Sequence, residues 1–175
     1  MQKFHHPYHL YLDEAVYFVT ARTYHSKCYI ELDNKKQLLF DQIQQVFSDH
    51  AYQLFAWIIL DNHYHLLFKS NRGSDLPKIM QHIHGGCSFK MNALDGVRGR
   101  KIFQNYWDTG IRNRRSFYIH FNYIHHNPVK HGYVSDMRDY QFSSYHDWCK
   151  KKGEDWILSC FETYPILDFL CRGDV

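Results

Sequence analysis

The sequence lacks the features that mark exported, membrane-spanning and multi-domain proteins. No apolar run approaches the roughly 20 residues that cross a bilayer, and residues 1–7 are polar where a signal peptide is apolar. No linker rich in proline, glycine or serine divides the 175 residues, and no segment repeats. We therefore expect one cytoplasmic domain over 1–175, with a core at about 15–145 and a C-terminal wrap at 146–175.

Cysteine is scarce and widely spaced. The five cysteines make an odd number, and no C-x-x-C pair points to a zinc site or a redox centre. They are Cys28, Cys87, Cys149, Cys160 and Cys171. We expect them to be reduced thiols.

Neither sign of charge is in large excess, since 21 lysines and arginines against 18 acidic residues give a net charge of +3. The 14 histidines and local basic groups such as Arg112, Arg114 and Arg115 can still make one face more positive than the total implies. This balance permits a nucleic-acid partner without requiring one.

The first half of the chain predicts a strand, a helix and a hairpin. Residues 15–22 are β-branched and aromatic, and a helix-like stretch follows from Asn34, which can serve as its N-cap, to Ala51. The apolar run 54–60 is too short for most helices and suits a strand buried on both faces. Asp61 and Asn62 then turn the chain into a partner strand at 63–69.

The second half predicts two helices around a strand. Asp75 can cap a helix that reaches 94, although the pair Gly85-Gly86 weakens its continuation. A strand is expected at 101–107, and a final helix begins at Ser116 and is expected to end before Pro128. The order indicates an α+β fold: a ferredoxin-like βαββαβ antiparallel sheet with helices on one face, plus an added C-terminal helix packed on the sheet.

Two histidines stand two residues apart on the predicted partner strand. His63 and His65 therefore face the same way, about 6.6 Å apart, and can share one metal ion. His82 and His84 repeat the spacing inside a predicted helix, where residues i and i+2 do not face each other. An isolated H-x-H pair more often holds no metal, but its place beside a buried strand and a tight turn favours a shared ion.

The final helix carries a second group of polar residues. Tyr123 and Asn127 are four residues apart and share one face, outside the apolar stripe of Phe117, Phe121 and Ile124. A helical tyrosine is usually a packing residue, and composition does not single out one of the 14 tyrosines.

Two segments together resemble a known family. The stretch 57–68 with its H-x-H pair, and the stretch 123–134 with the letters Y-I-H-H-N-P-V-K-H-G-Y-V, are similar to the single-tyrosine HUH transposases. The similarity is to the REP-associated tyrosine transposases in particular. It runs from about 17 to about 145 and includes the F-S-S-Y segment at 142–145.

The resemblance implies a role for each of these residues. His63 and His65 would bind a divalent metal, Mg²⁺ or Mn²⁺, and Tyr123 would be the nucleophile. Asn127 stands where the same helix would supply a third ligand, a position at which the insertion-sequence members of the family have glutamine.

The resemblance also implies a function and a partner. The chain would be a transposase-type strand transferase that nicks and rejoins single-stranded DNA at hairpin or REP-like ends, through a 5′-phosphotyrosine intermediate. Basic residues on either side of the tyrosine helix could contact phosphates. They are Arg112, Arg114, Arg115, Lys130 and His131.

Two other functions and the oligomeric state stay open on the sequence. The chain could be a domesticated module that binds hairpin DNA without cutting it. A hydrolase of small phosphorylated molecules could also use paired histidines, but no P-loop and no neighbouring carboxylate cluster supports it. The insertion-sequence members exchange the tyrosine helix within a dimer, whereas the REP-associated branch can act as a monomer, so both a monomer and a homodimer are compatible.

Overall fold

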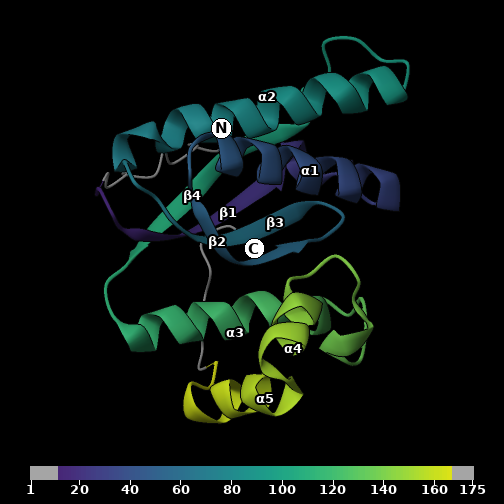
Figure 1. Ribbon diagram of the computed structural model, residues 1–175. Helices are drawn as coiled ribbons and strands as arrows, with labels where there is room; N and C mark the ends of the chain where they lie inside the picture. The colour runs from purple at the N-terminus through teal and green to yellow at the C-terminus, as the bar shows by residue number, and fades with distance from the viewer. Residues whose placement is uncertain (1–11, 167–175) are drawn as a thin grey trace, which may run out of the picture.

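The computed structural model describes residues 12–166, which form three layers around one sheet (Figure 1). The strands are β1 (Val16–Thr23), β2 (Gln53–Ile59), β3 (His63–Lys69) and β4 (Phe103–Ile111). The α-helices are α1 (Asp33–Asp49), α2 (Leu76–Leu94), α3 (Arg114–Lys130), α4 (Tyr145–Lys152) and α5 (Glu154–Thr163). Within 12–166, no helix combines the length and the apolar character that crossing a membrane requires.

The four strands form an antiparallel sheet in the order β2-β3-β1-β4. Helices α1 and α2 cover one face of this sheet, and α3 covers the other face, with α4 and α5 beyond it (Figure 1). The predicted α+β fold, ferredoxin-like with an added helix packed on the sheet, is confirmed. The added helix occupies the face that α1 and α2 leave open.

The strands carry a separate apolar surface on each face, because side-chain direction alternates along a strand. Tyr17 and Val19 of β1 point into the larger core, which α1 and α2 complete. Phe18, between them, points the other way into a second core with Leu67 of β3 and Phe121 of α3. Each face of the sheet therefore needs a helix layer of its own.

Helix α2 continues through Gly85 and Gly86 without a break, contrary to what the glycine pair suggested. Its buried residues Ile83 and Cys87 hold it against the larger core on both sides of the pair. Gly86 also has a packing role, because a Cβ atom there would lie 2.8 Å from Cδ of Gln42 on α1. The two helices thus approach closely at this point.

Helix α3 runs past Pro128 to Lys130, so the expectation that the proline ends it was wrong. Gly132, two residues beyond Lys130, terminates the helix, and its φ of +72° belongs to the left-handed region. The amide of Gly132 donates to the carbonyl of Val129 (3.0 Å), and that of Tyr133 donates to the carbonyl of Pro128 (2.9 Å). This pair of bonds is a Schellman motif, so the N-P-V-K-x-G letters specify the end of the helix.

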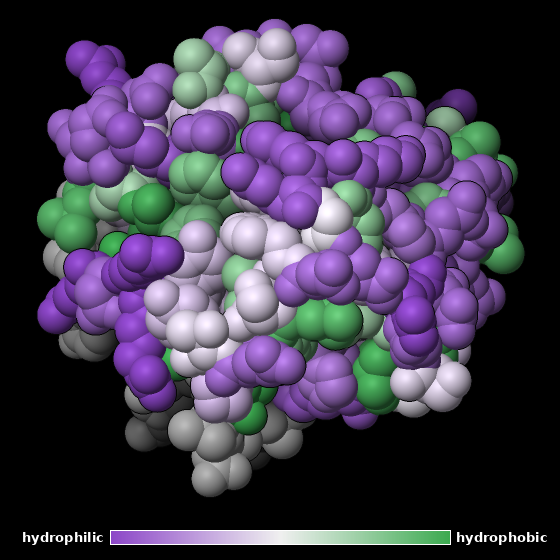
Figure 2. Space-filling model, turned by 60° about the horizontal axis from the view of Figure 1, so that its bottom comes forward, coloured by the Kyte–Doolittle hydropathy of each residue, from purple (hydrophilic) through white to green (hydrophobic). Residues whose placement is uncertain are grey.

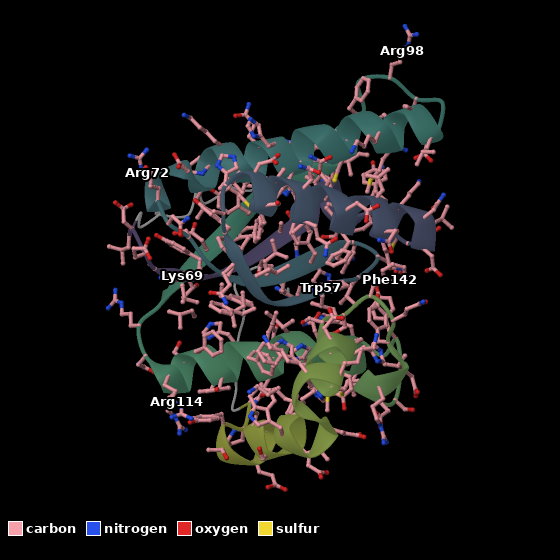
Figure 3. All side chains as sticks on the ribbon, viewed as in Figure 1. Trp57, Lys69, Arg72, Arg98, Arg114 and Phe142 are labelled. Atoms are coloured by element: carbon pink, nitrogen blue, oxygen red, sulfur yellow. The ribbon has the colours of Figure 1, made fainter. Side chains whose placement is uncertain are left out.

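The chain beyond α3 returns to the sheet and covers the outer edge of β2. The amide of Ile59 donates to the carbonyl of Phe142 (3.1 Å), and that of Ser144 donates to the carbonyl of Trp57 (3.0 Å). Figure 3 shows the labelled Trp57 and Phe142 on these neighbouring segments. These contacts involve residues 142–144, and of the segment expected as a C-terminal wrap, residues 167–175 lie outside the described residues.

Several element boundaries differ from those predicted. The first helix begins at Asp33, one residue before Asn34, and the last strand extends to Ile111. Helix α3 begins at Arg114 because Oδ1 of Asn113 accepts a hydrogen bond from the Ser116 amide (2.8 Å) and caps it. The four cysteines within 12–166 are free, and Cys171 lies outside that range.

The end of α3 provides a stability test. Gly132→Ala should lower the free energy of unfolding by about 1 kcal/mol, because a Cβ atom disfavours the left-handed conformation. Gly85→Ala is the matched control, since Gly85 is helical and faces open space. It should raise the same quantity by about 0.5–1 kcal/mol. Urea unfolding measures both, and unchanged stability in Gly132→Ala would contradict the assigned helix end.

Candidate active site

A row of polar side chains crosses the sheet near the β2–β3 turn, on the face that α3 covers. The register of β1 and β3 sets Thr20 opposite His65 and Arg22 opposite His63. The imidazole rings of His63 and His65 lie 5.2 Å apart between centroids, and both residues are buried. Four polar side chains thus share a small part of a face that is otherwise apolar.

Two residues of helix α3 that are four positions apart contact the two histidines of this row. Four residues span roughly 6.0 Å along a helix, and two residues span about 6.6 Å along a strand. The ring of Tyr123 therefore lies 5.5 Å from that of His65, while Oδ1 of Asn127 lies 3.2 Å from Nε2 of His63. Helix α3 and strand β3 thus meet in two side-chain pairs, Tyr123 with His65 and Asn127 with His63. Both pairs form within one chain.

The ring of His63 lies between two amide oxygens. Nδ2 of Asn62 donates to the carbonyl of Ser26 (3.1 Å), which turns Oδ1 of Asn62 toward Nδ1 of His63 at 2.7 Å. A proton on Nδ1 satisfies this contact and leaves Nε2 as the nitrogen that can bind a metal ion. Burial is the main cause that lowers the pKa of His63 to about 2, with further contributions from His65, His131 and Arg22.

Nε2 of His63 faces the amide oxygen of Asn127. Nδ2 of Asn127 is buried and makes no hydrogen bond within the described part of the chain. In the tautomer protonated at Nδ1, Nε2 of His63 and Oδ1 of Asn127 are both lone-pair donors and are close enough to share a cation. The residues present therefore fit a divalent ion, with two neutral imidazoles and one amide oxygen as its protein donors.

This donor set is small. Within 12–166 there is no group of three or more histidine, cysteine, aspartate or glutamate side chains suited to holding a metal. His63 and His65 with an amide as third donor would leave coordination positions open, as catalytic rather than structural sites do. Oγ1 of Thr20 lies 2.9 Å from Nδ1 of His65 and fixes the orientation of that ring.

The phenol of Tyr123 is enclosed by protein but borders a cavity. Its side chain is 1% exposed, and Nζ of Lys130 donates a hydrogen bond to its hydroxyl (2.9 Å). A cavity of about 400 Å³ adjoins it between α3 and the segment that follows α5. The lining residues are Tyr123, His126, Lys130, Phe161, Pro165 and Ile166.

The basic residues singled out in the sequence fall into two groups. Lys130 and His131 lie at the site, and the His131 ring is 4.9 Å from that of His63. Arg112, Arg114 and Arg115 are exposed at the opposite end of α3, where Figure 3 labels Arg114. Arg115 and Asn127 are about 18 Å apart along the helix axis.

Three residues of this site were not predicted from the sequence: Thr20, Arg22 and Asn62. Thr20 and Arg22 are polar residues two apart in an apolar strand, which is a signal that one face of that strand changes character. Asn62 directly precedes the H-x-H pair, but its part in orienting His63 depends on Ser26, 36 positions earlier. That contact exists only in the folded chain.

The second H-x-H pair separates as expected for a helix. His82 is exposed, whereas Nε2 of His84 lies 2.9 Å from the hydroxyl of Tyr64 and its ring stacks on Phe103. Burial lowers the pKa of His84 to about 3. These two histidines do not meet.

Known proteins share sequence with most of this chain. The protein family described as "Transposase IS200 like" matches residues 14–127. The REP-associated tyrosine transposase of Escherichia coli K12 is 28% identical over 142 residues, which cover 78% of this chain and 79% of that protein. A protein of Haemophilus influenzae is 28% identical over 143 residues, covering 71% of this chain and 81% of its own length.

A solved structure shares the fold. It is the structure of a REP-associated tyrosine transposase bound to a REP hairpin, with a TM-score of 0.70 and 24% identity. The match covers 100% of this chain and 94% of that one. The arrangement of layers is therefore common to both proteins.

Metal binding can be tested without any activity measurement. Mn²⁺ should raise the melting temperature, because an ion that binds only the folded chain stabilises it by about 2.7 kcal/mol at 100 times its Kd. A variant carrying both His63→Ala and His65→Ala should lose this shift. His82→Ala should keep it, since His82 is an exposed histidine far from the site in the sequence. An equal shift in all three proteins would place the ion elsewhere.

Proposed function

The chain belongs to the family of IS200-like transposases, and on that premise we propose that it nicks and rejoins single-stranded DNA at a hairpin end. Tyr123 is the nucleophile, and His63, His65 and Asn127 hold Mg²⁺ or Mn²⁺. The observation that carries the proposal is the two side-chain pairs between α3 and β3. They set the phenol of Tyr123 beside the buried candidate metal ligands of the same chain.

The chemistry transfers one phosphoryl group to the enzyme and back. The Tyr123 oxygen forms a bond to phosphorus as the bond to the 3′-oxygen breaks, which leaves a 3′-hydroxyl strand and a 5′-phosphotyrosine. A 3′-hydroxyl later attacks the same phosphorus and releases the tyrosine. Because each step exchanges one ester for another, rejoining needs no ATP. A bound divalent ion would neutralise charge on the phosphate and stabilise the leaving oxygen.

The residues around the ligand set suit a polyanion. Arg22 and His131 adjoin His63 on the strand and helix sides of the site, and each contributes to lowering its pKa. The cavity beside Tyr123 gives a nucleotide a route to a phenol that is otherwise enclosed. Figure 2 turns the face with α3 to α5 toward the viewer, and hydrophilic side chains surround a central area of paler and hydrophobic ones.

The three arginines at the start of α3 suit a more distant part of the DNA. Arg112, Arg114 and Arg115 are exposed, and the axial span of about 18 Å between Arg115 and Asn127 corresponds to several nucleotides. We assign them to backbone phosphates of the hairpin or its flank. The structure that shares this fold was determined with a REP hairpin bound, which supports a hairpin as the ligand class.

The nucleophile can be tested by trapping the covalent intermediate. With Mn²⁺ or Mg²⁺, wild type should form an adduct with a labelled hairpin oligonucleotide that survives denaturing electrophoresis. Tyr123→Phe should form none while its hairpin affinity stays within about twofold, because only one hydroxyl is lost. Tyr118→Phe is the control on the same helix and should form the adduct, since Tyr118 stacks on Tyr164 away from the histidines.

The same assay separates the competing functions. An undiminished adduct in Tyr123→Phe would reject this nucleophile. Hairpin binding by wild type with no cleavage under either metal would show a DNA-binding module without catalysis.

Mixing two inactive variants tests whether one chain holds the whole site. Tyr123→Phe and His65→Ala each alter one residue of a side-chain pair that forms within one chain. An equimolar mixture should therefore remain inactive, as each variant alone does. Recovered adduct formation would mean that the tyrosine of one chain serves the histidines of another.

A further inference from the structure

The ammonium group of Lys130 is directed at the phenol of Tyr123. Nζ donates a hydrogen bond to the tyrosine hydroxyl at 2.9 Å and lies 4.8 Å from the centroid of its ring. The two residues are seven positions apart on α3, so they lie two turns apart on one face. Sequence reasoning assigned Lys130 to a DNA phosphate, whereas here it contacts the atom that would form the bond to phosphorus.

We propose that Lys130 is a catalytic residue that stabilises negative charge on the Tyr123 oxygen, both as it attacks the phosphodiester and as it leaves. This inference rests on the proposed function and names a new member of its site. It gives the lysine a different role from that of a phosphate contact, and the two roles have different consequences for binding and rate.

Negative charge develops on the Tyr123 oxygen in both nicking and rejoining, so it has to be stabilised at that atom in both steps. In nicking, the phenol loses its proton to solvent, its oxygen bonds to phosphorus, and the departing 3′-oxygen takes up a proton. In rejoining, a 3′-hydroxyl loses its proton to solvent and its oxygen bonds to phosphorus. The bond between the tyrosine oxygen and phosphorus breaks, and its electron pair returns to the phenol oxygen, which then regains a proton from solvent. Lys130 stays protonated throughout and donates one charge-assisted hydrogen bond to that oxygen.

The fold keeps the lysine where this role requires it. Lys130 is the last residue of α3, and the Schellman bonds around Pro128 and Gly132 hold that turn in place. The phenol therefore has a cation beside it, held at the end of the helix that carries the phenol.

Three variants separate this role from a phosphate contact. Lys130→Met removes the charge, Lys130→Arg restores it, and Lys150→Met removes an exposed lysine of α4 as a control. Adduct formation is measured in single turnover at saturating hairpin DNA. Rejoining is measured separately, by supplying a 3′-hydroxyl strand to isolated adduct.

We expect Lys130→Met to slow both steps by about 10²-fold, as loss of one donor to a developing oxyanion does. Hairpin affinity and its salt dependence should stay unchanged. Lys130→Arg should recover most of the rate, and Lys150→Met should match wild type. Equal melting temperatures among the variants exclude a folding defect.

A more acidic phenol provides a readout that a structural role would not move. Replacing Tyr123 by 3,5-difluorotyrosine should speed rejoining more in the Lys130→Met protein than in the protein that keeps Lys130, because without the lysine more negative charge must be carried by the phenol itself. A lysine that only supports packing or binds a phosphate predicts the same acceleration in both proteins.

Each failure has its own meaning. A wild-type rate in Lys130→Met overturns the inference and leaves the proposed function intact. Weaker hairpin binding in Lys130→Met, with the salt slope reduced by about 1 and a normal rate at saturating DNA, identifies a phosphate contact instead. A wild-type chain that forms no adduct overturns the proposed function and this inference with it.

Discussion

The packing of α3 against β3 is the contact on which the rest of the site depends. Along a helix, four residues advance almost as far as two residues along a strand, so one pair of helix side chains can face one pair of strand side chains. Tyr123 and Asn127 meet His65 and His63 in this way, in opposite chain directions. A shift of α3 by one turn would move both helix residues out of contact with their partners together.

Several features of the fold hold α3 in this register. Phe121 and Ile124 anchor it in the second core of the sheet, which also contains Phe18 and Leu67. The chain beyond α3 is tied back to β2, and Nδ2 of Asn122 donates to carbonyls of Cys160 and Tyr164 in the outer layer (2.8 Å each). The added helices therefore fix the position of the nucleophile as well as covering apolar surface.

The sequence was sufficient for those parts of the structure that depend on local pattern. The β-branched and aromatic residues of β1, the short apolar run of β2 and the turn before His63 indicated the sheet, and the spacing of Tyr123 and Asn127 indicated a shared helix face. Pro128 misled because proline disfavours a helix interior, while the true end of the helix depends on the φ of Gly132 and two bonds that span it. The orientation of the His63 ring and the contact of Lys130 with Tyr123 depend on three-dimensional proximity, which no local pattern encodes.

Anomalous diffraction from crystals soaked in Mn²⁺ tests the central claim most directly. The account predicts one strong peak bonded to Nε2 of His63, Nε2 of His65 and Oδ1 of Asn127, with the Tyr123 side chain of the same chain beside it. A map with no peak at these three atoms, or with the tyrosine supplied by a neighbouring copy, would contradict it.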